Sequence, residues 1–198
     1  ELEAMDAMTL KCAQELSDAH VDVMGYACLV AIMSMGRGYH CVSEVNLHQE
    51  TVANDFPTPI VTSAGALING LKVLGAKQIS IITPYMRPLT DMVVDYIENQ
   101  GIKVKQSIAL EIPDNLEVAA QNPMNLLEIY KQLDLTDVDV LVASACVQMP
   151  SLEAIDLIQA ECGIPVTSAA VCTTYEMMKK LGIEAKSAIG GELLSGKY

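Results

Sequence analysis

One short sequence occurs twice in this chain, first as Val21-Asp-Val-Met-Gly-Tyr-Ala-Cys28 and again, one residue longer, as Val138-Asp-Val-Leu-Val-Ala-Ser-Ala-Cys146. Each copy has the β-branched, apolar character of a buried strand and ends on Ala-Cys. A second pair of near copies follows them, Pro59-Ile-Val-Thr-Ser-Ala64 and Pro165-Val-Thr-Ser-Ala169. The repeat predicts two similar lobes, each of which offers one thiol to a cleft between them. Two thiols facing each other can exchange protons with opposite sides of one small molecule.

Composition limits the classes of protein that need to be considered. The 198 residues are 51% hydrophobic, which is enough to build one compact domain or two small lobes. No apolar run reaches the roughly 18 residues that indicate a membrane span. The net charge of −13 disfavours nucleic acid and anionic membrane surfaces as partners. A small anionic substrate stays open, because backbone N–H groups at helix N-termini can bind carboxylates.

The chain has six cysteines and three histidines, without a C-x-x-C pair or a ligand-spaced cluster. We therefore expect no zinc site. With no secretory signal in the sequence, we expect reduced thiols in a cytoplasmic protein. The cysteines stand at positions 12, 28, 41, 146, 162 and 172.

Short apolar segments alternate with amphipathic ones along the chain, which is typical of an α/β fold with buried parallel sheets. Strands are expected at 21–27 and 59–62 in the first half, and at 78–83, 102–110, 138–144 and 164–168 in the second. Helices are expected at 1–19, 29–36, 43–54 with Ser43 as N-cap, 65–74, 87–99, 123–133, 150–161 and 172–181.

The strand count is unequal between the two halves, four against two. Two pseudo-symmetric lobes, each a parallel four-stranded sheet flanked by helices, would leave the first lobe without its N-terminal strands in this chain. About 45–50 residues are then expected to precede Glu1, because one βαβ unit needs about 30 residues or more. We assign residues 1–70 to the N-terminal lobe, with part of 175–198 packing back on it, and residues 71–174 to the C-terminal lobe.

Cys28 and Cys146 follow the carboxyl ends of their strands, where parallel α/β sheets bind ligands. Each also precedes a helical segment, whose positive end is expected to lower the pKa of the thiol. The backbone N–H groups of Leu29, Val30 and Val147 would face the same pocket as anion donors. The alternative is that both are ordinary buried cysteines, which behave as small hydrophobes. Their matching places in the repeat favour a catalytic pair.

Polar residues follow other strand ends as well. Tyr85 comes directly after strand 78–83 and could bind a substrate oxygen, or lie at the rim of the core. Asn115, after the next strand, could donate to a carboxylate or serve as a turn residue. Two Thr-Ser pairs, Thr62-Ser63 and Thr167-Ser168, end strands too. Their hydroxyls could bind a ligand or cap the helices that follow, and we expect capping.

Four motifs in this chain surround the candidate residues. They are Gly25-Tyr-Ala-Cys28-Leu-Val-Ala31, Thr83-Pro-Tyr85-Met, Pro113-Asp-Asn115-Leu and Ser144-Ala-Cys146-Val-Gln-Met-Pro-Ser151. Together they resemble the maleate cis-trans isomerase family, within the aspartate/glutamate racemase superfamily. The resemblance covers essentially the whole chain and implies two pseudo-symmetric lobes with the active site between them. It also implies a homodimer that needs no cofactor.

By this resemblance Cys28 is the nucleophile and Cys146 its partner acid/base. Cys28 would add to maleate, giving a covalent succinyl-thioether that rotates and then eliminates fumarate. Tyr85 and Asn115 match substrate-contacting positions, and Leu29, Val30 and Val147 match backbone donors to the carboxylates. The family's first strand ends in an Asn-bearing loop that also contacts substrate, and this chain lacks that segment.

Three other functions are weighed against this one. An amino-acid racemase of the same superfamily would use both thiols to move one α-proton. Arylmalonate decarboxylase keeps one cysteine and has Gly in place of the first, so Cys28 argues against it. A flavodoxin-like binding module would have no catalytic thiols, and its six cysteines would react uniformly and slowly with iodoacetamide.

Overall fold

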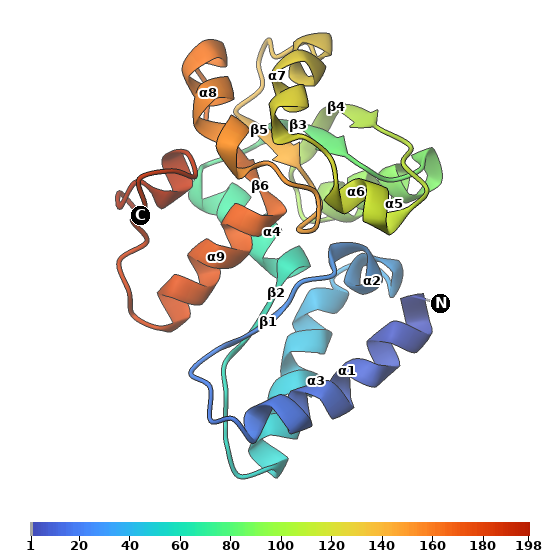
Figure 1. The fold of residues 1–198 in the computed structure, drawn as a ribbon, viewed down its shortest axis with the longest axis vertical. Coiled ribbons are helices and arrows are strands. Elements are labelled where there is room, and N and C mark those ends of the chain that lie inside the picture. The colour runs from blue at the N-terminus through green and yellow to red at the C-terminus, as the bar shows by residue number, and fades with distance from the viewer. Residues whose placement is uncertain (1) are drawn as a thin grey trace.

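The structure, a computed structural model, describes residues 2–198, with side chains from residue 4 onward. Two parallel sheets lie one above the other, each accompanied by helices (Figure 1). The predicted α/β class with buried parallel sheets is confirmed. None of the helices in the described part of the chain is long and apolar enough to cross a bilayer.

The first lobe is built on a two-stranded parallel sheet in which Met24 pairs with Ile60 and Tyr26 with Thr62. Its helices α1 and α3 pack against each other beside the sheet. We use "first lobe" for this sheet with α1, α2 and α3. The elements of this half are α1 (Leu2–Ser17), β1 (Met24–Tyr26), α2 (Leu29–Ser34), α3 (Tyr39–Ala53), β2 (Ile60–Thr62) and α4 (Ser63–Val73).

The second lobe is built on a four-stranded parallel sheet with the order β4-β3-β5-β6. All five residues of β5 are buried, which explains their uninterrupted apolar character. The elements are β3 (Gln78–Thr83), α5 (Arg87–Asn99), β4 (Lys103–Ala109), α6 (Asn115–Ala119), α7 (Leu126–Ile129), β5 (Val140–Ser144), α8 (Leu152–Cys162), β6 (Val166–Ser168) and α9 (Ala169–Lys180).

Side chains at the ends of two strands cap the helices that follow, as expected. The Thr62 hydroxyl accepts the N–H of Gly65 at 3.1 Å, and the Ser168 hydroxyl accepts that of Val171 at 3.2 Å. Each cap turns the chain sharply from strand into helix. The carboxyl ends of parallel strands therefore meet at one edge of their sheet, with helix N-termini beside them.

The main hydrophobic core extends from the second sheet into the first half of the chain. Leu29, Ile32 and Met33 of α2 belong to the same buried cluster as β3 and β5. A smaller cluster of Ala13, Met24, Leu47 and Ile60 lies under α1 and α3. Helix α2 is thus anchored in the core of the second lobe, although the chain reaches it from the first.

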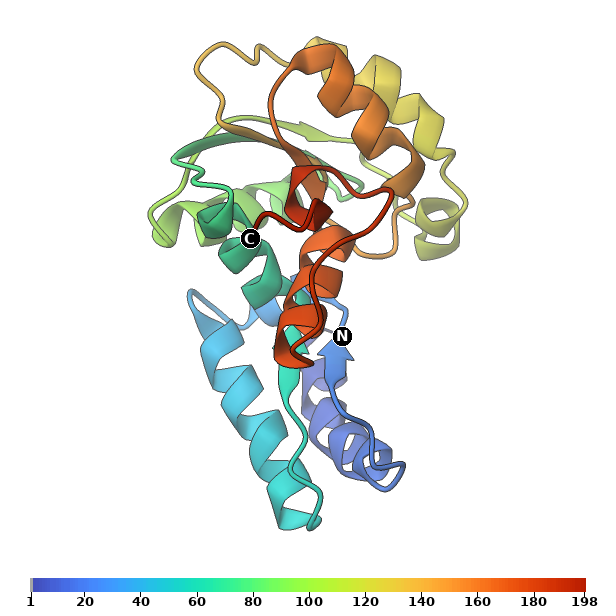
Figure 2. The same cartoon turned by 90° about the vertical axis from the view of Figure 1, so that its left-hand side faces the viewer.

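The last segments of the chain pack against more than one element. Helix α9 lies along α4 and descends to contact β1 and β2, as Figure 2 shows. The Asp156 carboxylate on α8 accepts the N–H groups of Gly190 and Gly191 at 3.1 and 2.9 Å. Part of the C-terminal region thus touches each lobe, and the domain boundary after residue 70 stays a prediction.

Several predicted bounds are wrong. Helix α3 begins at Tyr39, after Gly38 with φ +75°, so Ser43 is no N-cap and is buried inside the helix. The helix expected over 123–133 is a short α-helix, α7, between two 3-10 turns. A short helix, α6, begins at Asn115, which was considered as a turn residue. Strand β1 is three residues long, shorter than the predicted 21–27.

Candidate active site

Cys28 is the N-cap residue of α2, at the point where β1 turns into that helix. Its carbonyl accepts the N–H of Ile32 at 3.4 Å, and its side chain is half-buried. The first N–H groups of a helix have no partner within it. The backbone N–H groups of Leu29 and Val30 therefore stand beside the thiol, where they could bind an anion.

The pKa of the Cys28 thiol differs in direction from the expectation. Burial raises it, the backbone N–H of Ala31 lowers it, and the charge of Cys146 raises it again, with a net increase. Position at a helix N-terminus alone predicted a lower value. Removing the thiolate from water outweighs that contribution, because burial disfavours the charged form.

Cys146 lies two residues beyond the end of β5 and is 7% exposed. The Ser144 hydroxyl donates to the Cys146 carbonyl at 2.8 Å and accepts the Cys146 N–H at 3.3 Å. The Ala145 N–H donates to the carbonyl of Ile82 on β3 at 2.9 Å, which continues the sheet pairing. These bonds fix the turn that presents the second thiol.

Tyr85 brings the two cysteines into one site. Its hydroxyl donates to the carbonyl of Ala145 at 3.1 Å, next to Cys146. Burial raises the pKa of Tyr85 well above its usual value, and the charges of Cys146 and Cys28 raise it further. Both thiols therefore lie within electrostatic range of this hydroxyl and of each other. Tyr85 stays protonated near neutral pH and can serve as a hydrogen-bond donor.

Asn115 lies at the same edge of the sheet, and its backbone contacts the loop that carries Cys146. It is the first residue of α6 and its side chain is exposed, while Asp114 caps the helix. The Gln148 side-chain amide donates to the Asn115 carbonyl at 2.8 Å. The loop after β4 is thus tied, through its backbone, to the loop that carries Cys146.

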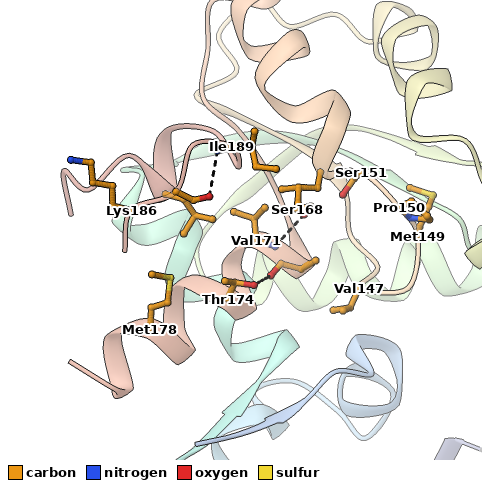
Figure 3. A pocket seen from close by; sticks show the side chains of 14 residues that line it. Val147, Met149, Pro150, Ser151, Ser168, Val171, Thr174, Met178, Lys186 and Ile189 are labelled. Atoms are coloured by element: carbon orange, nitrogen blue, oxygen red, sulfur yellow. Dashed lines mark hydrogen bonds between the residues drawn. The ribbon is translucent and has the colours of Figure 1, made fainter. Parts of the chain in front are cut away.

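Val147 borders a cavity of about 550 Å³ beside the Cys146 loop (Figure 3). Most of its wall is apolar, and the N-terminal ends of α8 and α9 meet there. Its polar members include Ser151, Ser168 and Thr174, with Lys186 toward the C-terminal segment. The opening is therefore next to the candidate site rather than between the two thiols.

Residues 4–194 of this chain match the family model described as arylmalonate decarboxylase. A maleate isomerase from Geobacillus stearothermophilus is 54% identical over 198 residues, which is 100% of this chain and 79% of that protein. The chain belongs to the maleate isomerase family.

Solved structures of maleate isomerases share this fold closely. A cysteine-to-alanine form from Pseudomonas putida with maleate has a TM-score of 0.98 at 57% identity, covering 100% of this chain and 79% of that one. A cysteine-to-serine mutant from Nocardia farcinica carries a covalently bound succinylcysteine intermediate, with a TM-score of 0.95 at 38% identity. It covers 100% of this chain and 80% of that one. As a maleate isomerase family member, this chain is an enzyme of the isomerase class.

Two residues at the candidate site of this maleate isomerase family member were not predicted from the sequence. Ser144 holds the Cys146 turn, and Gln148 links that turn to Asn115. Both lie in the Ser144-Ala-Cys146-Val-Gln motif. The polar residues that flank the cysteine in this motif could have indicated a role for Ser144 and Gln148. Their hydrogen-bond partners, however, depend on the conformation of the loop.

Proposed function

We propose that this chain converts maleate to fumarate, with Cys28 as nucleophile and Cys146 as proton donor and acceptor. The observation that carries the proposal is the convergence of Cys28, Cys146 and Tyr85, two thiols and one hydroxyl, in a chain of this family. Paired thiols suit an alkene diacid, because one can form a bond to carbon while the other supplies a proton.

In the first step the thiolate of Cys28, its proton already released to water, forms a bond from Sγ to one alkene carbon. The π electrons move toward the carboxylate on the other alkene carbon, giving an enediolate. The N–H groups of Leu29, Val30 and Val147 stabilise that charge, and the Tyr85 hydroxyl donates to a carboxylate oxygen. The thiol of Cys146 then gives its proton to the second carbon, leaving a succinyl group on Cys28 and a thiolate at Cys146.

The bond between the two former alkene carbons is now single and rotates. Cys146 thiolate removes a proton from the second carbon, the double bond forms again, and the bond from carbon to Cys28 breaks. Fumarate leaves, and both sulfurs regain their starting protonation states. These reaction steps need no metal or cofactor, because a thiolate is a good nucleophile and also a tolerable leaving group. Asn115 is proposed as a further contact to a carboxylate.

Proton NMR of the alkene signals tests this function directly. We expect maleate to be converted to fumarate, and Cys28→Ala to reduce the rate by at least about a thousandfold. Cys12→Ala, which changes an exposed cysteine on α1, is the matched control and should keep the full rate. Conversion at the normal rate by Cys28→Ala would refute the nucleophile. Inversion of aspartate or glutamate without maleate turnover would indicate the racemase instead.

Two coarser features are also proposed. All six cysteines are free thiols, which supports a reducing, cytoplasmic location. We further propose a homodimer, supported by apolar side chains exposed on one helix of the first lobe. They are Val42, Val45 and Val52 of α3, each about half exposed. Sedimentation equilibrium at twice the monomer mass is the expected result.

A further inference from the structure

The turn between α2 and α3 belongs to the first lobe and contacts helix α5 of the second. Gly36 and Gly38 have φ values of +116° and +75°, in the left-handed region that favours glycine. Between them, the Arg37 guanidinium forms a two-pronged ion pair with Asp95 on α5. Its Nε donates to Oδ2 at 2.9 Å, and a terminal N–H donates to Oδ1. This pair links the Cys28 segment to the helix that follows Tyr85.

A second contact lies beside the first but is buried. The backbone N–H of His40 donates to the Tyr96 hydroxyl at 3.1 Å, and the same hydroxyl lies 2.5 Å from His40 Nδ1. Burial lowers the pKa of His40, so the ring is neutral and Nδ1 accepts the Tyr96 proton. Tyr96 is 1% exposed and adjoins Asp95 in sequence. Two consecutive residues of α5 thus hold Arg37 in the turn and His40 in the first turn of α3.

Helix α5 also leads back to the reacting groups. It begins at Arg87, directly after Tyr85 and Met86, and the Thr90 hydroxyl contacts the Tyr85 carbonyl at 3.4 Å. Helix α2, which Cys28 caps, packs against α5 (Figure 1). One end of α5 therefore fixes Tyr85 and, through Ala145, the Cys146 turn. Its other end fixes the segment that carries Cys28.

We propose that Arg37, His40, Asp95 and Tyr96 form an interlobe clasp, in which Arg37 and Tyr96 are positioning residues that hold Cys28 against Cys146 and Tyr85. The inference rests on the proposed function. An exposed ion pair adds little to stability, so the Arg37 pair acts mainly on geometry. A displacement of about 1 Å at a reacting atom can cost up to about a hundredfold in rate.

Steady-state kinetics with maleate test the clasp in the full chain. Arg37→Gln and Tyr96→Phe should each lower kcat by about tenfold, with KM changed by less than about threefold. The reversed pair, Arg37→Asp with Asp95→Arg, should recover most of the lost kcat. Lys131→Gln is the matched control, because Lys131 forms exposed ion pairs within the second lobe, and it should leave kcat unchanged.

Cross-linking of Cys28 to Cys146 gives a readout that does not depend on turnover. A short bifunctional maleimide should bridge them severalfold more slowly in Arg37→Gln than in the parent, with Cys12 and Cys41 changed to Ser in both. Slower bridging with no maleate conversion by the parent would support the clasp and refute the proposed function. Unchanged kcat and unchanged bridging in Arg37→Gln would overturn the clasp, whatever Tyr96→Phe does to folding.

Discussion

Cys28 and Tyr85 share an environment that acts in opposite ways on the roles proposed for them. Burial favours the neutral form of each group, so it raises the pKa of both. For Tyr85 this preserves a proton donor. For Cys28, burial reduces the fraction of nucleophilic thiolate near neutral pH. The backbone N–H of Ala31 acts in the opposite direction and lowers the pKa, but by less.

The raised pKa of Cys28 predicts how its reactivity depends on pH. Because protonation is favoured in the folded protein, the thiolate appears only at a pH above the value of about 8.5 that a free cysteine shows. Alkylation of Cys28 by iodoacetamide, followed by peptide mass spectrometry, should therefore rise with a midpoint above that pH. A midpoint below it would mean that the helix N-terminus dominates. The unfolded chain in denaturant is the reference.

Removal of the Tyr85 hydroxyl should weaken binding of the charged substrate. A hydrogen bond to a charged group is worth about 1.5–3 kcal/mol, so Tyr85→Phe should lower kcat/KM for maleate by about 10- to 100-fold. Tyr130→Phe is the matched control, since Tyr130 is a buried tyrosine whose charged neighbours include Glu161 and Cys162 rather than Cys28 and Cys146. Equal activity of both variants would remove Tyr85 from the site.

The sequence repeat was sufficient to place both thiols at strand ends, because the rule depends only on parallel strands and their order. It could not give the Ser144 and Gln148 bonds, since these depend on how a loop turns back on itself. The predicted shift in the pKa of Cys28 was wrong in direction. The position of the thiol at a helix N-terminus can be inferred from the sequence, whereas its degree of burial cannot.

At the scale of elements, strand β3 and helix α5 lie at the predicted residues, 78–83 and 87–99. Both have strong patterns and clear ends, with Pro88 in the first turn of the helix. Helix α3 was misplaced because Gly38, in a left-handed conformation, starts it without a side-chain cap. The segment 123–133 has helical spacing, but its helix is interrupted by 3-10 turns.

The contact between α4 and α9 depends on a glycine. A Cβ on Gly70 would lie 2.6 Å from Cys172 Sγ and 3.1 Å from a Leu193 methyl group. Although alanine favours helix, Gly70→Ala should lower the free energy of unfolding by about 1–3 kcal/mol through overpacking. Urea denaturation measures this change.

Asn69→Ala, at an exposed position of the same helix, is the control for that change and should have little effect. Adding Cys172→Ala to Gly70→Ala should restore part of the lost stability, because it removes the Sγ atom that the new methyl group would overlap. A Gly70→Ala protein as stable as the parent would show that the two helices can separate freely.

At the scale of the whole molecule, the candidate site draws its groups from both lobes. Cys28 arrives from the first sheet, whereas Cys146 and Tyr85 follow strands of the second. Helix α2 joins the core of the second lobe, and α9 reaches down to the first sheet (Figure 2). The relation between the two thiols is therefore a property of how the lobes pack, and neither lobe holds the pair alone.

Trapping the covalent intermediate tests the central claim, that Cys28 attacks the substrate while Cys146 handles the proton. The Cys146→Ser variant is incubated with maleate, digested and analysed by peptide mass spectrometry. Because the weaker acid/base slows elimination, we expect one succinyl group to accumulate on Cys28 and on no other cysteine. A variant that turns over maleate with no adduct, or an adduct spread over the exposed cysteines, would contradict the account.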